Sequence, residues 1–404
     1  MGYKTYRLAP AENATPSQNG VTMGQGEIEN RFFKLALDAQ TGAVRSIYDK
    51  ELSREIVDAN AADKANQFVA RWVQTGKQEG PQEVKIRAGQ NGPVYGSIVA
   101  SSRGAGCPQI TQEIILYDRI KRIDFANRVL KDSTPLLEIY FAFPFKVDNP
   151  AIRFEASNSV IEPLKDQFPG SNSNYYAVQH WADVSDGEIG VALSPIESHL
   201  VEFGGLWPCY VSQAHHGVTP PDFGRAFVKA DELKKGYMYS FAMDSNFRTN
   251  FQPVQQGDML FRYSVSTHKG DWKKGGVRRF GWSVGNPLMA AVVEGKRQGK
   301  LEKKASFCQV DTPNVMVLTL KRVAWFMYWP IMMPANWEST RYIRIANSCR
   351  RKFDRFWISW LNASATARTG ISGHRERRFP VSRQPHANQE SLPFVEKAAG
   401  KNNR

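Results

Sequence analysis

Apolar and polar residues alternate at every second position through most of the first 293 residues, a pattern typical of strands with one buried face. Residues 33–37 alternate in this way, and residues 44–48 return as a partner strand. Between them, residues 39–42 supply a turn in which Gly42 stands where a positive φ is expected. Residues 28–58 therefore predict a β-hairpin that opens a large antiparallel domain.

Further strands are expected over residues 113–117, 120–131, 136–145, 187–194 and 259–267. Residues 136–145 are apolar on both faces, as in a strand buried inside a sandwich, and Pro144 and the later Pro150 are expected to mark the end of this strand. Helical periodicity is scarce, and residues 58–69 are the best short helix candidate. The pattern predicts an all-β fold, a large antiparallel supersandwich.

Composition narrows the class of protein. A chain of 404 residues with 42% hydrophobic residues can bury a sizeable core, and its four cysteines form no C-x-x-C pair. We therefore expect no disulfide framework and a reducing, cytoplasmic location. No apolar run reaches the roughly 20 residues of a membrane-spanning helix, and no secretion signal is recognisable, so we expect no membrane partner.

The net charge of +14 is concentrated in one part of the chain. Residues 323–404 hold 14 Lys and Arg against 5 Asp and Glu, whereas the longer first part is nearly balanced. Half of the ten tryptophans also fall in this last part, which shows neither strand nor helix periodicity. We expect an irregular, largely disordered tail there.

Four segments resemble a known family. These are residues 28–58, residues 112–129 (QEIILYDRIKRIDFANRV), residues 177–186 (AVQHWADVSD) and residues 246–251 (NFRTNF). In order and spacing they resemble the C-terminal β-domain of glycoside hydrolase family 38, the zinc-dependent retaining α-mannosidases. The resemblance extends over residues 2–293 and implies a supersandwich of the galactose-mutarotase type.

The resemblance also implies a domain plan. Residues 1–27 correspond to the end of the preceding linker and strand, and residues 28–293 to the family's β-supersandwich domain. Residues 294–322 would start a terminal β-segment, and residues 323–404 form an unrelated basic tail. On this reading the chain begins where the catalytic half of such an enzyme has finished.

Catalytic residues are not expected in this chain. A retaining glycosidase uses two carboxylates about 5 Å apart, and the family adds a zinc ion whose motif begins with a His-x-Asp pair. None of the seven histidines has Asp two positions later, and no βα alternation indicates a catalytic barrel. We therefore predict no catalytic residue, no metal ligand and no cofactor here, with zinc confined to the missing catalytic domain.

Sugar contact is predicted for residues 202–251, where aromatic residues stand among Gly and Pro ahead of amide and guanidinium side chains. Aromatic faces stack on sugar C–H surfaces, and Asn and Arg bond hydroxyl groups. The candidate substrate-binding residues are Trp207, His215, His216, Asn246, Arg248 and Asn250. Each candidate also has a structural explanation that needs no sugar. The tryptophan could pack in the core, the histidines could be solvated, and the asparagines could cap turns.

Two basic segments need an explanation. Residues 269–279 (KGDWKKGGVRR) place basic residues around a tryptophan, which suits single-stranded nucleic acid, but a solvated loop is favoured. Three explanations are possible for the tail: a divergent module, a nucleic-acid-binding appendage or a shifted reading frame near Arg322. The frameshift is favoured.

Taken together, the sequence predicts the carbohydrate-associated C-terminal β-domain of an α-mannosidase, inactive by itself. Expected partners are a mannose-containing glycan and a separately encoded catalytic domain. A free-standing carbohydrate-binding module is the first alternative. Nucleic-acid binding through the basic tail is the second, although nucleic acid is not the expected partner.

Overall fold

The computed structural model describes residues 2–6, 20–157, 159–207, 227–246, 252–292 and 302–306. The chain divides into two compact units. In one of them, strand β1 (Gly2–Lys4) pairs antiparallel with β22 (Lys304–Ser306). The other unit, Tyr6–Leu301, contains every other described strand. The predicted tail and most of residues 294–322 lie outside the described residues.

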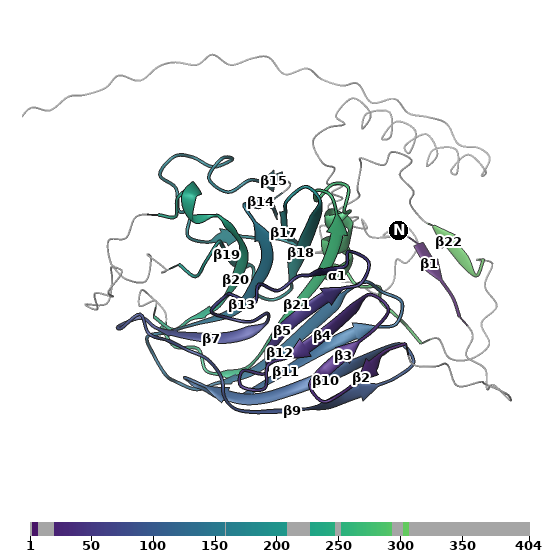
Figure 1. Ribbon diagram of the computed structural model, residues 1–404, viewed down its shortest axis with the longest axis horizontal. Helices are drawn as coiled ribbons and strands as arrows, with labels where there is room; N and C mark the ends of the chain where they lie inside the picture. The colour runs from purple at the N-terminus through teal and green to yellow at the C-terminus, as the bar shows by residue number, and fades with distance from the viewer. Residues whose placement is uncertain are drawn as a thin grey trace, which may run out of the picture. The chain divides into compact units, whose positions relative to one another are not determined.

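The larger unit contains a nine-stranded sheet, which Figure 1 shows as a curved layer. Its neighbouring strands pair antiparallel. In the long central strands, every second side chain points into the core. In spatial order the strands are β15 (Ser159–Ile161), β14 (Ala151–Ala156), β17 (Ala182–Ser185), β18 (Ile189–Pro195), β21 (Gly257–Lys269), β12 (Ile123–Lys131), β11 (Cys107–Tyr117), β10 (Tyr95–Gly104) and β9 (Gln82–Asn91).

A six-stranded sheet forms the second layer, and its pairings are also antiparallel. In spatial order its strands are β16 (Tyr176–Ala177), β19 (Leu200–Phe203), β20 (Lys235–Asp244), β13 (Leu137–Asp148), β7 (Gln67–Trp72) and β8 (Gln78–Glu79). One face of this sheet packs on the main core, and the other face carries the polar cluster described below.

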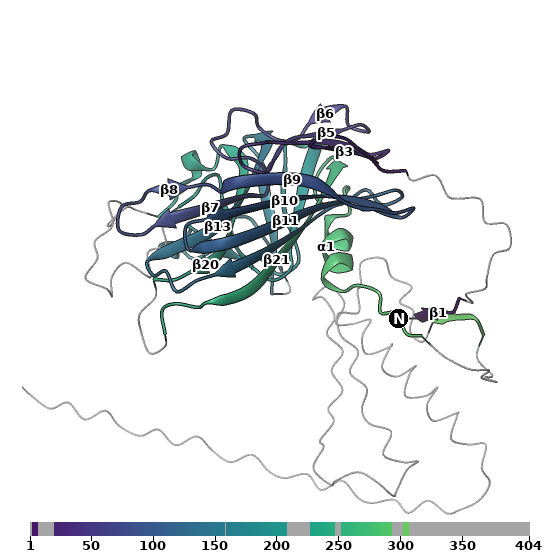
Figure 2. The ribbon, with the colours of Figure 1, turned by 90° about the horizontal axis from the view of Figure 1, so that it is seen from below.

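A five-stranded sheet completes the unit, and Figure 2 shows it along one side of the larger sheets. It consists of β2 (Thr22–Met23), β3 (Glu27–Glu29), β4 (Phe33–Leu37), β5 (Val44–Asp49) and β6 (Arg54–Glu55). The predicted hairpin of residues 28–58 is confirmed, because β4 and β5 pair antiparallel and Gly42 has a φ of 69°. The ladder already begins at Thr22.

The helices of the described residues are short. The α-helix α1 spans Val277–Gly285, and the 3₁₀ turn η1 spans Ala230–Glu232. Trp272, inside the basic segment of residues 269–279, stacks on the fully buried Trp181 with ring centroids 5.2 Å apart. That segment therefore anchors the start of α1, a role that its loop-like composition did not indicate. No helix in the described part of the chain is long and apolar enough to cross a bilayer.

The packing of strand β13 explains why the sequence of residues 136–145 is apolar at successive positions. Leu137, Ile139 and Phe141 enter the main core, whereas Tyr140 and Ala142 join a smaller apolar cluster on the opposite face. The strand is therefore covered on both sides. Burying one such aromatic or aliphatic side chain contributes about 1.5–3 kcal/mol.

The predicted helix at residues 58–69 is wrong. The Asp58 N–H donates to the Pro144 carbonyl, and the Asp58 carboxylate accepts the Asn60 N–H, so the chain turns there. Asn66 has a φ of 59°, and Gln67 begins β7. Pairing with β13 outweighs the weak local helix pattern.

Pro144 does not end its strand, because β13 continues to Asp148, two residues before Pro150. The N and carbonyl of one strand residue point to the same side. The Pro144 carbonyl accepts from Asp58 on the edge that faces β7, and the pairing with β7 reaches only to Ala142 opposite Gln67, so the missing N–H costs the ladder with β20 nothing. The prediction of an all-β antiparallel supersandwich is confirmed.

Candidate functional site: a buried carboxyl cluster on the six-stranded sheet

Charged and phenolic side chains gather on the face of the six-stranded sheet that is turned away from the main core. Alternation along each strand places them there, because neighbouring residues point to the core. Arg71 comes from β7, Glu138 and Tyr140 from β13, Glu202 from β19 and Asp244 from β20. We call these five residues the carboxyl cluster. Strand register sets Glu138 directly opposite both Arg71 and Asp244.

The strongest contact in the cluster joins Arg71 to Glu138. The Arg71 Nη1 atom lies 2.8 Å from Glu138 Oε2, and the Tyr140 hydroxyl donates to the same oxygen at 3.3 Å. Glu138 is fully buried. Burial raises the pKa of Glu138 to about 7, and it outweighs the opposing effect of the Arg71 charge.

Glu202 is also fully buried but lacks a cation within hydrogen-bonding distance among the described residues. Its Oε2 atom accepts the backbone N–H of Trp207 at 2.5 Å. Burial raises the pKa of Glu202 well above its usual range, and the nearby charge of Glu138 raises it further. Burial likewise raises the pKa of Asp244 to about 6. One guanidinium thus faces three carboxyl groups, and burial raises the pKa of each of them.

Three buried side chains near this cluster keep polar atoms without a hydrogen-bond partner in the described part of the chain. They are Glu138 at Oε1, Glu202 at Oε1 and Asn246 at both side-chain polar atoms. Such an atom costs about 1–3 kcal/mol when it stays unsatisfied. A face that retains several of them is suited to bind a polar molecule.

Two of the six predicted sugar-contact residues, Trp207 and Asn246, lie in the described part of the chain. Trp207 is half-buried, and its indole N–H donates to the Phe203 carbonyl at 2.7 Å. Asn246 is buried, and its backbone N–H donates to Asp244 Oδ1 at 2.8 Å. The structure therefore connects Trp207 to Glu202 and Asn246 to Asp244. The remaining four candidates, His215, His216, Arg248 and Asn250, lie outside the described residues.

Sequence reasoning missed Arg71, Glu138 and Glu202. The signal was present, since each is the one charged residue within a mainly apolar stretch, QFVARW, LEIYFAFPF and LVEF respectively. A charge is almost never fully buried unless it is paired, so a lone charge in a two-sided apolar strand indicates a buried partner. The sequence could not identify that partner, because the strands are far apart along the chain.

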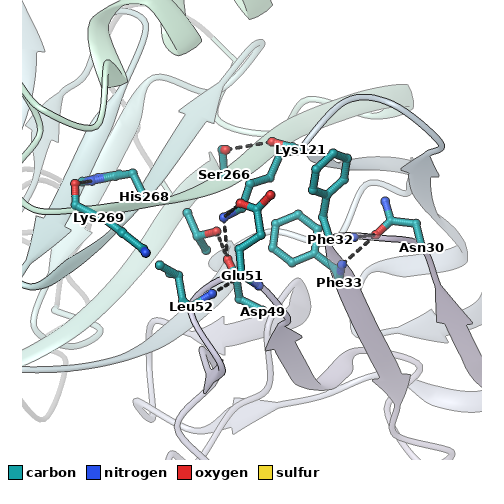
Figure 3. Close-up of polar contacts among 11 residues, drawn as sticks. Asn30, Phe32, Phe33, Asp49, Glu51, Leu52, Lys121, Ser266, His268 and Lys269 are labelled. Carbon is teal, nitrogen blue, oxygen red and sulfur yellow. Dashed lines mark hydrogen bonds and ion pairs between the residues drawn. The ribbon is translucent and has the colours of Figure 1, made fainter.

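A second polar group joins the five-stranded sheet to β21 and is shown in Figure 3. Asp49 Oδ1 accepts the N–H groups of Glu51 and Leu52 at 2.8 Å each. Its Oδ2 atom lies 2.9 Å from Lys121 Nζ and accepts the Thr267 hydroxyl. Every acceptor here has a partner, so we interpret this group as a structural joint.

The described histidines also have structural partners. His268 Nε2 lies 2.7 Å from Asp183 Oδ1 in the nine-stranded sheet. His180 Nδ1 lies 3.0 Å from Glu155 Oε2, and its ring stacks on Trp282 of α1. Within the described residues, no group of His, Cys, Asp and Glu is arranged to hold a metal ion. These residues therefore do not fit the zinc implied by the family resemblance, and we assign them no zinc chemistry.

Comparison with known proteins agrees with this architecture. Residues 28–199 match the family described as glycosyl hydrolases family 38 C-terminal domain. The sequence matches no curated protein.

Among solved structures, an α-mannosidase from Enterococcus faecalis V583 is similar at 15% identity, over 69% of this chain and 33% of that one, with a TM-score of 0.52. A family 38 protein from Enterococcus faecalis is similar at 15% identity, over 74% and 36%, with a TM-score of 0.51. A galactose mutarotase-like protein from Lactobacillus casei ATCC 334 matches at 12% identity over 62% and 100%, with a TM-score of 0.36.

This chain thus spans about a third of the length of the two family 38 structures. At these identities, their similarity shows the shared fold. The family match covers residues 28–199, from β3 to the residue before β19. Over this segment the chain is similar to the C-terminal domain of the glycosyl hydrolases of family 38.

Proposed function

We propose that this chain acts as the carbohydrate-associated C-terminal β-domain of an α-mannosidase. In this role it supports the active-site cleft, contacts a mannose-containing glycan and does not turn over substrate by itself. The observation that carries the proposal is the family match of residues 28–199 on an antiparallel supersandwich. A separately encoded catalytic domain is its proposed partner.

The polar face of the six-stranded sheet supports glycan contact. It combines buried carboxyl groups, a guanidinium and the amide of Asn246 with aromatic rings, among them the stacked pair Tyr140 and Phe241 at 4.9 Å. Sugar rings present hydroxyl groups that donate and accept, together with C–H faces that pack on aromatic rings. Such sites are lined mainly by apolar and aromatic side chains with a few convergent polar groups.

A free-standing carbohydrate-binding module is the alternative, and the same face supports it. The two functions differ in their dependence on a catalytic partner. The module would bind glycan with its full affinity alone, whereas the β-domain would bind better, and enable turnover, only together with a zinc-containing catalytic domain.

The first test is retention of the full chain on immobilised mannan, with elution by a soluble α-linked mannobiose. We expect retention that galactobiose does not reverse. Absence of retention, together with failure to associate with a family 38 catalytic domain, would refute the proposal.

The second test concerns turnover. The chain is incubated with an aryl α-mannoside, with and without added zinc or cobalt, and we expect no release of the aryl group. Turnover that copurifies with the chain and disappears when one of its own carboxyl groups is replaced would show that catalysis resides in this chain.

A further inference from the structure

We propose that Glu138 and Glu202 bind the hydroxyl groups of a neutral sugar, Glu138 as the acceptor and Glu202 as the donor, at a site beside Trp207. The inference rests on the proposed function, because both assign carbohydrate to this face of the six-stranded sheet. It goes further by naming the two side chains that recognise the ligand and by giving each a distinct role.

The first step is the pairing of each carboxyl group. Glu138 uses Oε2 for Arg71 and Tyr140, which leaves Oε1 as an acceptor. Glu202 uses Oε2 to accept the Trp207 N–H, which leaves Oε1. Because an oxygen that accepts an N–H is a poor place for a proton, the proton of a neutral Glu202 carboxyl resides on Oε1 and can be donated.

The second step is the charge of the site. Among the described residues, the titratable groups facing Glu202 are Arg71 on β7, Glu138 and Tyr140 on β13, and Tyr239 and Asp244 on β20. Arg71 is the single cation among them, and Glu138 balances it at 2.8 Å. A further buried charge would be strongly disfavoured. The site therefore suits a neutral ligand better than an anion or a metal ion.

The third step identifies the ligand class. One unpartnered acceptor on Glu138 and one donor on Glu202 match neighbouring hydroxyl groups, each of which can both donate and accept. Asn246 is an independent indication, because both polar atoms of its buried side chain are unpartnered in the described part of the chain. Asn246 follows the end of β20, and its backbone N–H donates to Asp244 Oδ1 at 2.8 Å, which holds it next to the carboxyl cluster.

The segment that ends at Trp207 lies against Glu202, because the Trp207 N–H donates to that carboxyl group. Leu206 and Trp207 are half-buried and follow Gly204, which has a φ of 81°. Leu206 packs against the small apolar cluster that contains Tyr140 and Phe241. A sugar that reaches Glu202 must shift this segment, so the Trp207 N–H bond to Glu202 reports directly on occupancy.

The experiment measures binding of methyl α-mannoside, methyl α-glucoside and methyl β-galactoside to the full chain by calorimetry near pH 8, above the Glu138 pKa of about 7. Three variants are compared, Glu202→Gln, Glu202→Leu and the exposed control Glu188→Leu. Gln keeps an acceptor for the Trp207 N–H and a donor for the ligand, whereas Leu removes both without leaving a buried charge. We expect Glu202→Gln to bind within about threefold of the wild type and Glu202→Leu to bind roughly tenfold more weakly. The control should bind as the wild type does.

A second measurement uses the wild-type protein alone and follows the Trp207 backbone amide. In amide-resolved NMR of the wild type, addition of the bound glycoside should shift the Trp207 backbone amide. An unmoved Trp207 amide, or wild-type affinity in Glu202→Leu, would overturn the site while leaving mannan retention and the proposed function intact. Failure of all three glycosides to bind would likewise overturn the site. Glucoside or galactoside binding lost in Glu202→Leu would instead support the site and contradict the mannoside assignment.

Discussion

Arg71 and Glu138 lie directly opposite each other on β7 and β13, with Arg71 Nη1 2.8 Å from Glu138 Oε2. Both side chains are buried on the face turned away from the main core. Replacement of both by apolar residues of similar volume is often neutral in other proteins, whereas removal of one leaves a buried charge. The pair can therefore form only in the correct register of β7 and β13, and it places two charged groups on this face of the sheet.

Loss of the cation alone should be costly. We expect Arg71→Met to lower the free energy of unfolding by about 3 kcal/mol at pH 8, because it leaves Glu138 as an unpaired buried charge. The loss should shrink at pH 5.5, where Glu138 holds a proton. Denaturant titration measures both values.

The double variant Arg71→Met/Glu138→Leu should recover most of this loss, since no unpaired charge remains. Arg262→Met is the control, because its contact with Glu197 is largely exposed, and it should change stability by less than about 1 kcal/mol. A double variant as unstable as the single one would contradict the ion-pair explanation.

Stability should fall as the pH rises from about 5 to 7. The pKa of Glu138 is about 7 in the folded protein and 4.5 as its ordinary value, so the folded state binds more protons in this window. Asp244, with a pKa of about 6, and Glu202 act in the same direction. Each such group contributes a slope of at most about 1.4 kcal/mol per pH unit.

Glu202→Gln should flatten this pH profile and raise stability at pH 8, because Gln removes the carboxyl group whose pKa is raised by folding and which ionises more readily in the unfolded chain. The control is Asp258→Asn. The Asp258 pKa is lowered by its contact with Arg128, so its contribution is lost only below the tested window. Thermal unfolding from pH 5 to 8 measures the slopes, and an unchanged slope in Glu202→Gln would count against a protonated Glu202.

The joint at Asp49 should be important for stability. Asp49→Ala removes the acceptor for two backbone N–H groups and the buried partner of Lys121, and should cost about 3 kcal/mol. Glu51→Ala removes only an exposed contact with the same lysine and should cost less than about 1 kcal/mol. Equal losses in denaturant unfolding would show that the joint does not depend on Asp49.

For Gly281 in α1, the predicted change in stability on replacement by alanine is opposite to the change that helix propensity alone predicts. Alanine is favoured over glycine inside a helix by about 1 kcal/mol. A Cβ on Gly281, however, would lie 2.7 Å from both the His180 carbonyl oxygen and the Trp181 Cβ. We therefore expect Gly281→Ala to be destabilising, whereas Ser283→Ala on the exposed side should be neutral or slightly stabilising. Stabilisation by Gly281→Ala would show that α1 packs less closely than described.

The sequence alone determined the strands and the fold class. Alternation is a local property, so residues 33–37 and 44–48 revealed a hairpin, and the two-sided apolar character of residues 136–145 revealed a strand buried on both faces. The failures were local as well. The weak helix pattern at residues 58–69 gave way to pairing with β13, and Pro144 stood where its missing N–H cost nothing.

The site was decided by tertiary structure. Arg71, Glu138 and Glu202 are each the one charge within a mainly apolar stretch, and their separation along the chain hides their association. Only the order of β19, β20, β13 and β7 within one sheet, with its register, brings them to one face. Register and sheet order depend on pairings between distant segments, which are selected by burial of the whole core and not by local pattern.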